Sequence, residues 1–276
     1  MTLELENSGC WLGRVWNTEA AGPSVVTVRE NRVFDITSRA APTVRDICEM
    51  EDPAGYVRTA SGIEIGALDE FFVDGSAWTP LAPIDFQAVK ACGVTFAGSM
   101  VERVIEEQAA GDPSQAEAIR RRVGETIGNS LRNITPGSAE AAQIKKALIA
   151  EGLWSQYLEV GIGPDAEVFS KAQVLSSVGH LSQIGLHPVS RWNNPEPEVV
   201  LAVTSTGRVV GATLGNDVNL RDVEGRSALL LSKAKDNNGS CAIGPMLRLF
   251  DRDFGIDDIR KAELGLRVTG TDGFVL

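Results

Sequence analysis

The sequence is poor in several features that define large classes of proteins. Only 2 of its 276 residues are histidines, 6% are aromatic, and its 4 cysteines are scattered without a C-x-x-C pair. We therefore expect neither a zinc site nor a disulfide framework. We expect the thiols to be reduced, as they are in the cytoplasm. No apolar run approaches the roughly 18 residues of a membrane span. The N-terminal stretch has neither the basic start nor the apolar core of a signal peptide.

Positive charge is also in short supply. The chain has 26 Lys and Arg against 37 Asp and Glu, which gives a net charge of −11. This balance argues against nucleic acid and anionic membranes as main partners, although a local positive pocket for a small acid remains compatible with it. With 43% hydrophobic and 23% charged residues, the composition is typical of a soluble globular protein. The length fits one large domain or two small ones.

Two strand-like runs, residues 199–203 and 209–214, are separated by a short polar break that contains Gly207. This pattern predicts a β-hairpin. A two-residue loop and a four-residue loop give the same register, in which Glu196 lies opposite Asp217. A three-residue loop would shift that register and weaken the pairing.

Three carboxylates are expected to crowd the open end of this hairpin. Glu196 and Glu198 are two residues apart in an extended chain and so point to the same side, where Asp217 faces them. Directly opposed Cβ atoms lie about 4.5–5.5 Å apart, and like charges at that spacing are relieved by a proton or a bound cation. An all-oxygen site favours Mg²⁺, Mn²⁺ or Ca²⁺. The alternative is a solvated acidic hairpin end without a ligand.

The same residues resemble motifs of the fumarylacetoacetate hydrolase family. These motifs are the E-x-E, the N-D about twenty residues later, and a Lys nine residues before a Gly-Pro pair. Longer strings are similar to one branch of that family, the bacterial 2-keto-3-deoxy-D-pentonate (xylonate or arabinonate) dehydratases of non-phosphorylating pentose catabolism. They read WNNPEPEVVL, GNDVNLRDVEGRSALLLSKAKDNN and LIAEGLWSQYLEVGIGPDAEVFSKAQ. The resemblance covers nearly the whole chain.

The resemblance implies an α+β fold, the mixed β-roll of that family. It places a small N-terminal α+β domain at residues 1–82 and a catalytic domain at 83–276, with a linker marked by the prolines of residues 79–83. Members of the branch continue well beyond residue 276, so we expect a C-terminal part of the catalytic domain to be missing.

Local patterns add individual elements to this outline. Thr43 is a candidate N-cap for a short helix. Runs rich in β-branched and aromatic residues predict strands at residues 11–16, 24–28, 33–36, 167–171 and 264–268.

A helical lid is expected over residues 99–152. Ser99 and Glu102 form a capping box before an amphipathic helix. Two further helices are predicted over residues 114–127 and 138–151. We expect this segment to be more mobile than the β core, because lids are drawn from regions of low stability.

Further site residues follow from the resemblance. Lys235 holds the family's lysine position, which implies that it binds the keto acid or polarises its carbonyl group. Lys171, Ser176 and Arg221 match stretches that line the family's site. Taken alone, either lysine is more often a surface residue. Of the pair Lys233 and Lys235, we expect one side chain to point into the site and the other to point away. Asn219, Glu224 and Arg226 are equally compatible with a local salt-bridge network.

The lid departs from the family's hydrolases in one respect. Those enzymes carry a His with a Glu three residues later as a base toward water, and the matching positions here are Ser99 and Glu102. This difference removes the water-activating dyad but leaves one carboxylate that can move a proton. Helix capping by Glu102 is the alternative role, and both roles are compatible in different states of the lid.

The resulting hypothesis is a hydro-lyase with Mg²⁺, or alternatively Mn²⁺, on Glu196, Glu198 and Asp217. Glu102 removes a C3 proton from 2-keto-3-deoxy-D-pentonate, and the product is 2-oxoglutarate semialdehyde. The alternatives are a hydrolase that cleaves a C–C bond in a 2,4-diketo-3-deoxy sugar acid and an inactive fragment that binds metal and keto acid. The expected partners are the small 2-keto acid and further copies of the chain in a homodimer or homotetramer.

Overall fold

The structure, a computed structural model, describes every residue except 1–2, 74–75, 77, 94–116, 120 and 123–133. Its chain divides by packing into two compact units. Unit 1 comprises residues 1–89 and 170–276, and unit 2 comprises residues 90–169. The sequence-based division into an N-terminal domain (1–82) and a catalytic domain (83–276) concerns the expected role of each part. Packing does not test it, so it stays a prediction.

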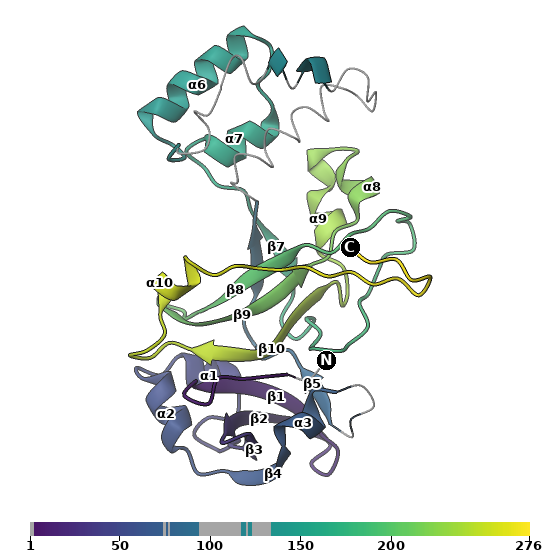
Figure 1. Ribbon diagram of the computed structural model, residues 1–276. Helices are drawn as coiled ribbons and strands as arrows, with labels where there is room; N and C mark the ends of the chain where they lie inside the picture. The colour runs from purple at the N-terminus through teal and green to yellow at the C-terminus, as the bar shows by residue number, and fades with distance from the viewer. Residues whose placement is uncertain (1–2, 74–75, 77, 94–116, 120, 123–133) are drawn as a thin grey trace. The chain divides into compact units, whose positions relative to one another are not determined.

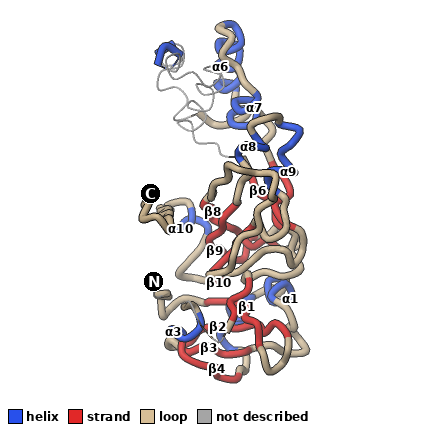
Figure 2. The backbone as a smooth tube through the Cα atoms, turned by 90° about the vertical axis from the view of Figure 1, so that its right-hand side faces the viewer, coloured by secondary structure: helices blue, strands red, loops and turns tan. Residues whose placement is uncertain are grey.

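Unit 1 is built on an eight-stranded antiparallel sheet in the order β4-β3-β2-β1-β10-β9-β8, with β5 paired to β1 off that path. Figure 2 shows β10 between the N-terminal strands and the β8–β9 hairpin, so strands from both ends of the sequence form one sheet. The strands are β1 (Trp11–Asn17), β2 (Gly22–Arg29), β3 (Arg32–Asp35), β4 (Ile63–Ala67), β5 (Thr79–Leu81), β8 (Pro197–Val203), β9 (Val209–Asp217) and β10 (Cys241–Leu249).

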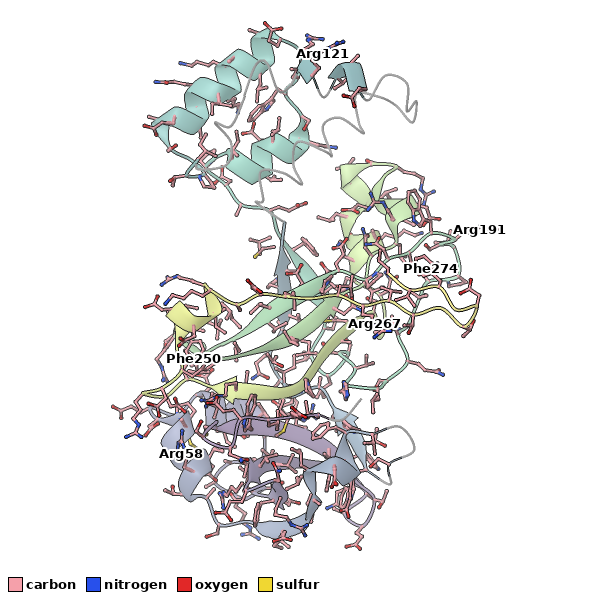
Figure 3. The ribbon with its side chains drawn as sticks, in the orientation of Figure 1. Arg58, Arg121, Arg191, Phe250, Arg267 and Phe274 are labelled. Atoms are coloured by element: carbon pink, nitrogen blue, oxygen red, sulfur yellow. The ribbon has the colours of Figure 1, made fainter. Side chains whose placement is uncertain are left out.

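Short helices connect these strands (Figure 1). As predicted, Thr43 caps the first of them by accepting a hydrogen bond from the backbone N–H of Asp46. An ion pair between Arg58 and Asp251 ties α2 to the end of β10, where Figure 3 labels Arg58 and Phe250. The helices are α1 (Val44–Cys48), α2 (Pro53–Thr59), α3 (Leu68–Phe71), α8 (Arg221–Glu224), a 3₁₀ turn (Ala228–Leu230), α9 (Leu231–Lys235) and α10 (Ile256–Ile259).

Unit 2 contains α6 (Ala139–Ala150) and α7 (Gln156–Ile162), and the paired strands β6 (Val89–Cys92) and β7 (Val168–Ala172) lead the chain into and out of it. The helix expected near 138–151 is confirmed, because α6 spans Ala139–Ala150 and Ser138 is its N-cap. The helix expected from residue 99, and most of the one at 114–127, lie outside the described residues, and the lid as a moving element stays a prediction. None of the helices described is long and apolar enough to cross a membrane.

Two sequence expectations are wrong. Residues 79–83 do not form a linker, because Thr79–Leu81 is strand β5 and pairs with β1. Proline is tolerated there because β5 is a short strand off the main path of the sheet. Residues 264–268 do not form a strand, since the only bridge in this part of the described chain joins Thr269 to Val275. A strand-like composition forms a strand only where a neighbouring strand offers a pairing edge.

Candidate functional site

The register of the β8–β9 hairpin is the one expected from the sequence. Glu198 pairs with Gly215, and the N–H of Asp217 donates to the carbonyl of Glu196 at 2.9 Å. Glu196 therefore lies opposite Asp217, at the open end of the hairpin. Because side chains alternate along a strand, Glu198 shares the face of these two residues.

The loop that produces this register was not expected. The Thr204 N–H donates to the Arg208 carbonyl, so the loop has three residues and not two or four. Gly207, with φ of 85°, provides the left-handed residue that such a loop needs. Val203 then pairs with Val209, but Ala202 pairs with Gly211, so β9 carries one extra residue. This β-bulge restores the register that the three-residue loop alone would have shifted.

A lysine ammonium group lies between two of the three carboxylates. Lys235 Nζ donates to Glu196 Oε2 and lies 3.2 Å from Asp217 Oδ2. Burial lowers the pKa of Lys235, but the charges of Glu196 and Asp217 outweigh it and raise the pKa above its ordinary value. Lys235 is 3% exposed at the end of α9, whereas Lys233 is exposed. The expectation that only one lysine of the pair points into the site is confirmed.

A second lysine lies behind the first. Lys171 Nζ, on β7, donates to the carbonyls of Val218 at 2.8 Å and Lys235 at 2.5 Å and to Ser240 Oγ at 3.2 Å. It also lies 3.1 Å from Asp217 Oδ1, at ion-pair distance without hydrogen-bond geometry. Burial lowers the pKa of Lys171 below its ordinary value, and the charge of Asp217 offsets only part of this effect. Lys171 thus anchors the chain segments that carry Asp217 and Lys235.

Glu196 is held at both carboxylate oxygens. Oε2 accepts from Lys235, while Oε1 accepts from Asn219 Nδ2 at 3.1 Å and from Asn194 Nδ2 at 3.5 Å. The Glu196 N–H donates to Asn216 Oδ1 at 3.0 Å. The side chain is therefore fixed in one orientation, with its charge turned toward Lys235.

Glu198 differs from its neighbour. No side-chain hydrogen bond joins it to another residue that the structure describes. Burial, followed by the negative charges of Asp217 and Glu196, raises its pKa, although Lys235 lowers it. Within the described part of the chain, no three acidic, His or Cys side chains are grouped closely enough to hold a metal ion as they stand. The cation bound between Glu196 and Asp217 is the Lys235 ammonium group.

The contacts of the remaining expected site residues differ from one residue to the next. Arg221, at the start of α8, lies over the Trp192 ring, 5.2 Å from its centre. Ser176 Oγ donates to the Gln173 carbonyl within a local turn, and none of the hydrogen bonds found among the described residues joins Ser176 to the carboxylates. Glu102 lies outside the described residues, and its role as a base stays a prediction.

Sequence reasoning missed the supporting polar residues. Asn219 was considered only as part of a local network, and its contact with Glu224 is present, but it also binds Glu196. The alternation that placed Glu198 beside Glu196 would also have placed Asn219 beside Asp217. No sequence signal indicated Ser240, which lies in the turn before β10 and whose Oγ is 3.0 Å from the Lys235 carbonyl.

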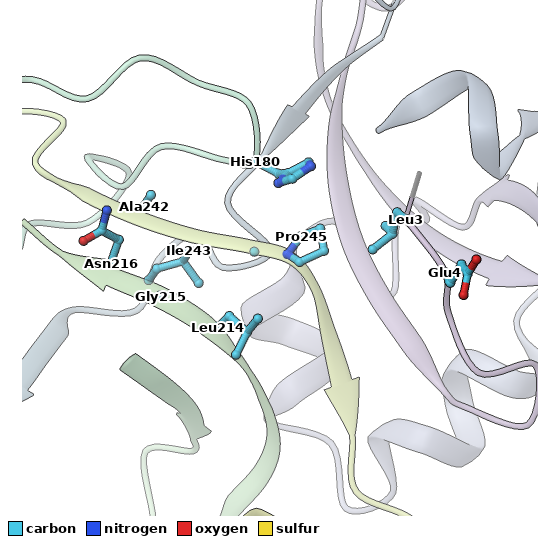
Figure 4. Close-up of a pocket in the computed structure, with 10 residues that line it drawn as sticks. Leu3, Glu4, His180, Leu214, Gly215, Asn216, Ala242, Ile243 and Pro245 are labelled. Atoms are coloured by element: carbon cyan, nitrogen blue, oxygen red, sulfur yellow. The ribbon is translucent and has the colours of Figure 1, made fainter. Parts of the chain in front are cut away.

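A cavity of about 680 Å³ lies elsewhere on the same strands (Figure 4). Its lining includes Leu214 and Asn216, which alternate with Asp217 along β9 and so project from the opposite face of that strand. The other lining residues are mostly apolar: Leu3, Glu4, His180, Gly215, Ala242, Ile243, Gly244 and Pro245. The carboxylate group therefore does not open into this cavity.

Comparisons with known proteins show what the chain is similar to. No model of a known protein family matches the chain. Over 81 residues it is 38% identical to 2-dehydro-3-deoxy-D-arabinonate dehydratase from Saccharolobus solfataricus, a match that covers 29% of this chain and 27% of that protein. A longer match of 224 residues, 27% identical, is with a protein from Haloferax volcanii named probable 2-keto-3-deoxyxylonate dehydratase. It covers 79% of this chain and 61% of that protein. The chain is thus similar in sequence to two proteins that are named as dehydratases of 2-keto-3-deoxypentonates.

The fold agrees with this relationship. The structure matches that of a 2-keto-3-deoxy-D-arabinonate dehydratase complexed with magnesium and 2,5-dioxopentanoate, with a TM-score of 0.54 at 19% identity, over 87% of this chain and 66% of that one. The resemblance stated from the sequence and the α+β fold class are thereby confirmed. The chain spans 27% and 61% of the two relatives in sequence and 66% of this solved chain.

Proposed function

We propose that the chain carries the active site of a divalent-cation-dependent hydro-lyase that converts 2-keto-3-deoxy-D-pentonate to 2-oxoglutarate semialdehyde. Its relatives are named as dehydratases of such acids, of the arabinonate and xylonate types. The dehydratase that shares the fold was solved with magnesium and with 2,5-dioxopentanoate, another name for that semialdehyde. The proposed cofactor is Mg²⁺, with Mn²⁺ as a substitute, and the partner is a small 2-keto acid.

One observation carries the proposal: a buried cationic group bound between Glu196 and Asp217. The ammonium group of Lys235 shows that these two carboxylates converge on one positive charge. Asp217 Oδ1 is buried 3.1 Å from Lys171 Nζ but accepts no hydrogen bond in the described structure, so its hydrogen-bonding capacity is not filled. Glu198, which forms no side-chain hydrogen bond with the residues that the structure describes, is proposed as the third oxygen donor on the same face. Carboxylate oxygens are the donors that a hard divalent cation prefers, although these described side chains are not grouped closely enough to hold one as they stand.

In this proposal Glu196, Glu198 and Asp217 hold the cation, which when bound polarises the substrate's carbonyl group and makes its C3 hydrogens more acidic. Lys235, kept charged by the two carboxylates, binds the acid group of the substrate. Lys171 supports the site from within, because its ammonium group already faces four acceptor atoms. Its predicted contact with substrate stays a prediction, as do those of Ser176 and Arg221.

The reaction needs one proton to be removed from C3 and the C4 hydroxyl group to leave with a proton as water, which gives the 3,4-unsaturated 5-hydroxy-2-keto acid. Tautomerisation then moves hydrogen from C5 and its hydroxyl group to C3 and C4 and yields the semialdehyde. The predicted base is Glu102, a residue outside the described part of the chain. General-base catalysis typically contributes about 10²–10⁴-fold. Glu102→Gln should therefore lower kcat by about that factor while leaving substrate affinity near normal.

A substrate comparison tests the proposal. The chain is assayed with 2-keto-3-deoxy-D-xylonate, 2-keto-3-deoxy-D-arabinonate and a 2,4-diketo-3-deoxy acid, each with Mg²⁺ or with EDTA. Mg²⁺-dependent formation of the semialdehyde is expected. Release of pyruvate from the diketo acid at a higher kcat/KM would replace the dehydratase with a hydrolase. Binding of Mn²⁺ without turnover of any acid would leave only a binding function.

A further inference from the structure

Asn219 occupies a central position in the site that the proposed mechanism leaves without a role. Its side chain is fully buried, with 0% of its surface exposed. Its backbone forms a bridge to Asn194, with N–H to carbonyl distances of 3.0 and 3.1 Å in the two directions. The residue is thus fixed next to the strand end that carries Glu196 and two residues after Asp217.

The side-chain amide of Asn219 joins two carboxylates. Nδ2 donates to Glu196 Oε1 at 3.1 Å and also to Glu224 Oε2 on α8. An amide nitrogen has two hydrogens, so both are used by acidic acceptors. The amide oxygen is buried and accepts no hydrogen bond within the described structure. A buried, unsatisfied carbonyl costs free energy, which indicates that this orientation is maintained by the two carboxylate contacts.

These contacts determine which way Glu196 points. With Oε1 held by Asn219, the other oxygen is directed at Lys235 and so toward the side shared with Asp217. Hydrogen bonds to an ionised acceptor are about twice as strong as neutral ones. Glu198 has no equivalent support among the described residues. The two glutamates of the E-x-E motif are therefore unequal: one is pre-oriented and the other adjustable.

We propose that Asn219 is a positioning residue that holds Glu196 in the orientation required to bind the divalent cation. This inference rests on the proposed function, since it assumes that the carboxylates bind a metal. Glu224 serves as the outer anchor of the same amide. Residues that orient a metal ligand through a hydrogen bond typically change metal affinity by about 10–100-fold when removed.

Asn219→Ala tests this role, with Mn²⁺ binding followed by titration and by the electron paramagnetic resonance of the bound ion. The Kd for Mn²⁺ should rise about 10–100-fold, and the spectrum of the bound ion should change. Leu220→Val is the matched control, because Leu220 is the next residue, is equally buried and packs in a cluster with Val223 and Ala234, and its aliphatic side chain cannot form a hydrogen bond with Glu196. It should lower the melting temperature but leave the Kd for Mn²⁺ unchanged.

A double-mutant cycle separates positioning from general destabilisation. If Asn219 acts through Glu196, then Asn219→Ala should have no further effect on the Kd for Mn²⁺ in the Glu196→Gln background. The same fold-change in both backgrounds, or equal weakening by Leu220→Val, would overturn the inference and leave the proposed function intact. Failure of the unaltered chain to bind Mn²⁺ would overturn both.

Discussion

The two ends of the β8–β9 hairpin are held in opposite ways. At the tip, the N–H and Oγ of Ser205 each donate to Glu49 at 2.8 Å, and Arg208 donates to backbone carbonyls that follow α1. All of these contacts are exposed to solvent. At the open end, Lys235 and Asp217 form an ion pair that is almost completely buried. One end is a solvated attachment, and the other is a cluster of charges removed from water.

The two ends therefore have different roles: the tip sets the register of the strands, and the open end holds the buried charges. Exposed polar contacts contribute little free energy, because water competes for the same groups. They nevertheless fix where the tip lies, and the bulge after it sets the register that brings Glu196 opposite Asp217. Buried charges have large and opposing desolvation and Coulomb energies. Substitutions at the open end should therefore affect stability and activity strongly, and those at the tip only weakly.

The largest effect is expected from Lys235→Met. It would leave Glu196 and Asp217 as two like charges without their shared cation, and breaking a buried ion pair costs about 3–5 kcal/mol. Urea unfolding in EDTA measures this loss, and turnover with Mg²⁺ should fall by at least about 10²-fold. Lys233→Met, on the exposed side of the same short helix, is the control and should leave both unchanged. Equal stability of the two variants would show that the buried pair does not support the fold.

An intermediate effect on stability, with a specific pH dependence, is expected from Glu198→Gln. The pKa of Glu198 is raised, so the folded chain holds this proton more tightly than the unfolded chain does. In EDTA, the free energy of unfolding should therefore fall as the pH rises through the range just above the ordinary value of 4.5. Glu198→Gln should remove this part of the slope and abolish Mg²⁺-dependent turnover. An unchanged slope would mean that Glu198 ionises in the folded chain as it does in water.

The smallest effect is expected at the tip, from Gly207→Ala. Gly207 has a φ of 85°, and a Cβ there would meet no atom within 4 Å, so only the backbone conformation carries a cost. That cost is about 1–2 kcal/mol, seen as a lower urea midpoint with activity retained. Gly255→Ala, in equally open space but with a φ of −151°, should cost less. Loss of turnover in Gly207→Ala would show that the register depends on the tip alone.

Much of this arrangement could be predicted from residue patterns. The hairpin, its register, the Thr43 helix cap and the helix near 138–151 follow from local rules and are confirmed. One lysine of the pair, Lys235, is buried against the carboxylates and the other is exposed, as expected. The strand expected at 264–268 and the linker expected at 79–83 were wrong, because composition does not say whether a partner strand is available. The register prediction succeeded through a loop of a different length, corrected by a bulge that no residue pattern indicated.

By itself, the sequence determined the acidic E-x-E and N-D pairing, because alternation along two adjacent strands is a local property of the chain. Only the tertiary structure decided what surrounds those acids. Lys171 on β7 reaches Asp217, Asn219 after β9 reaches Glu196, and Lys235 on α9 reaches both, with 39 positions of sequence between Lys235 and Glu196. Burial and charge at the site depend on these long-range contacts. The tertiary structure therefore made Glu196 the fixed carboxylate of the pair and Glu198 the adjustable one.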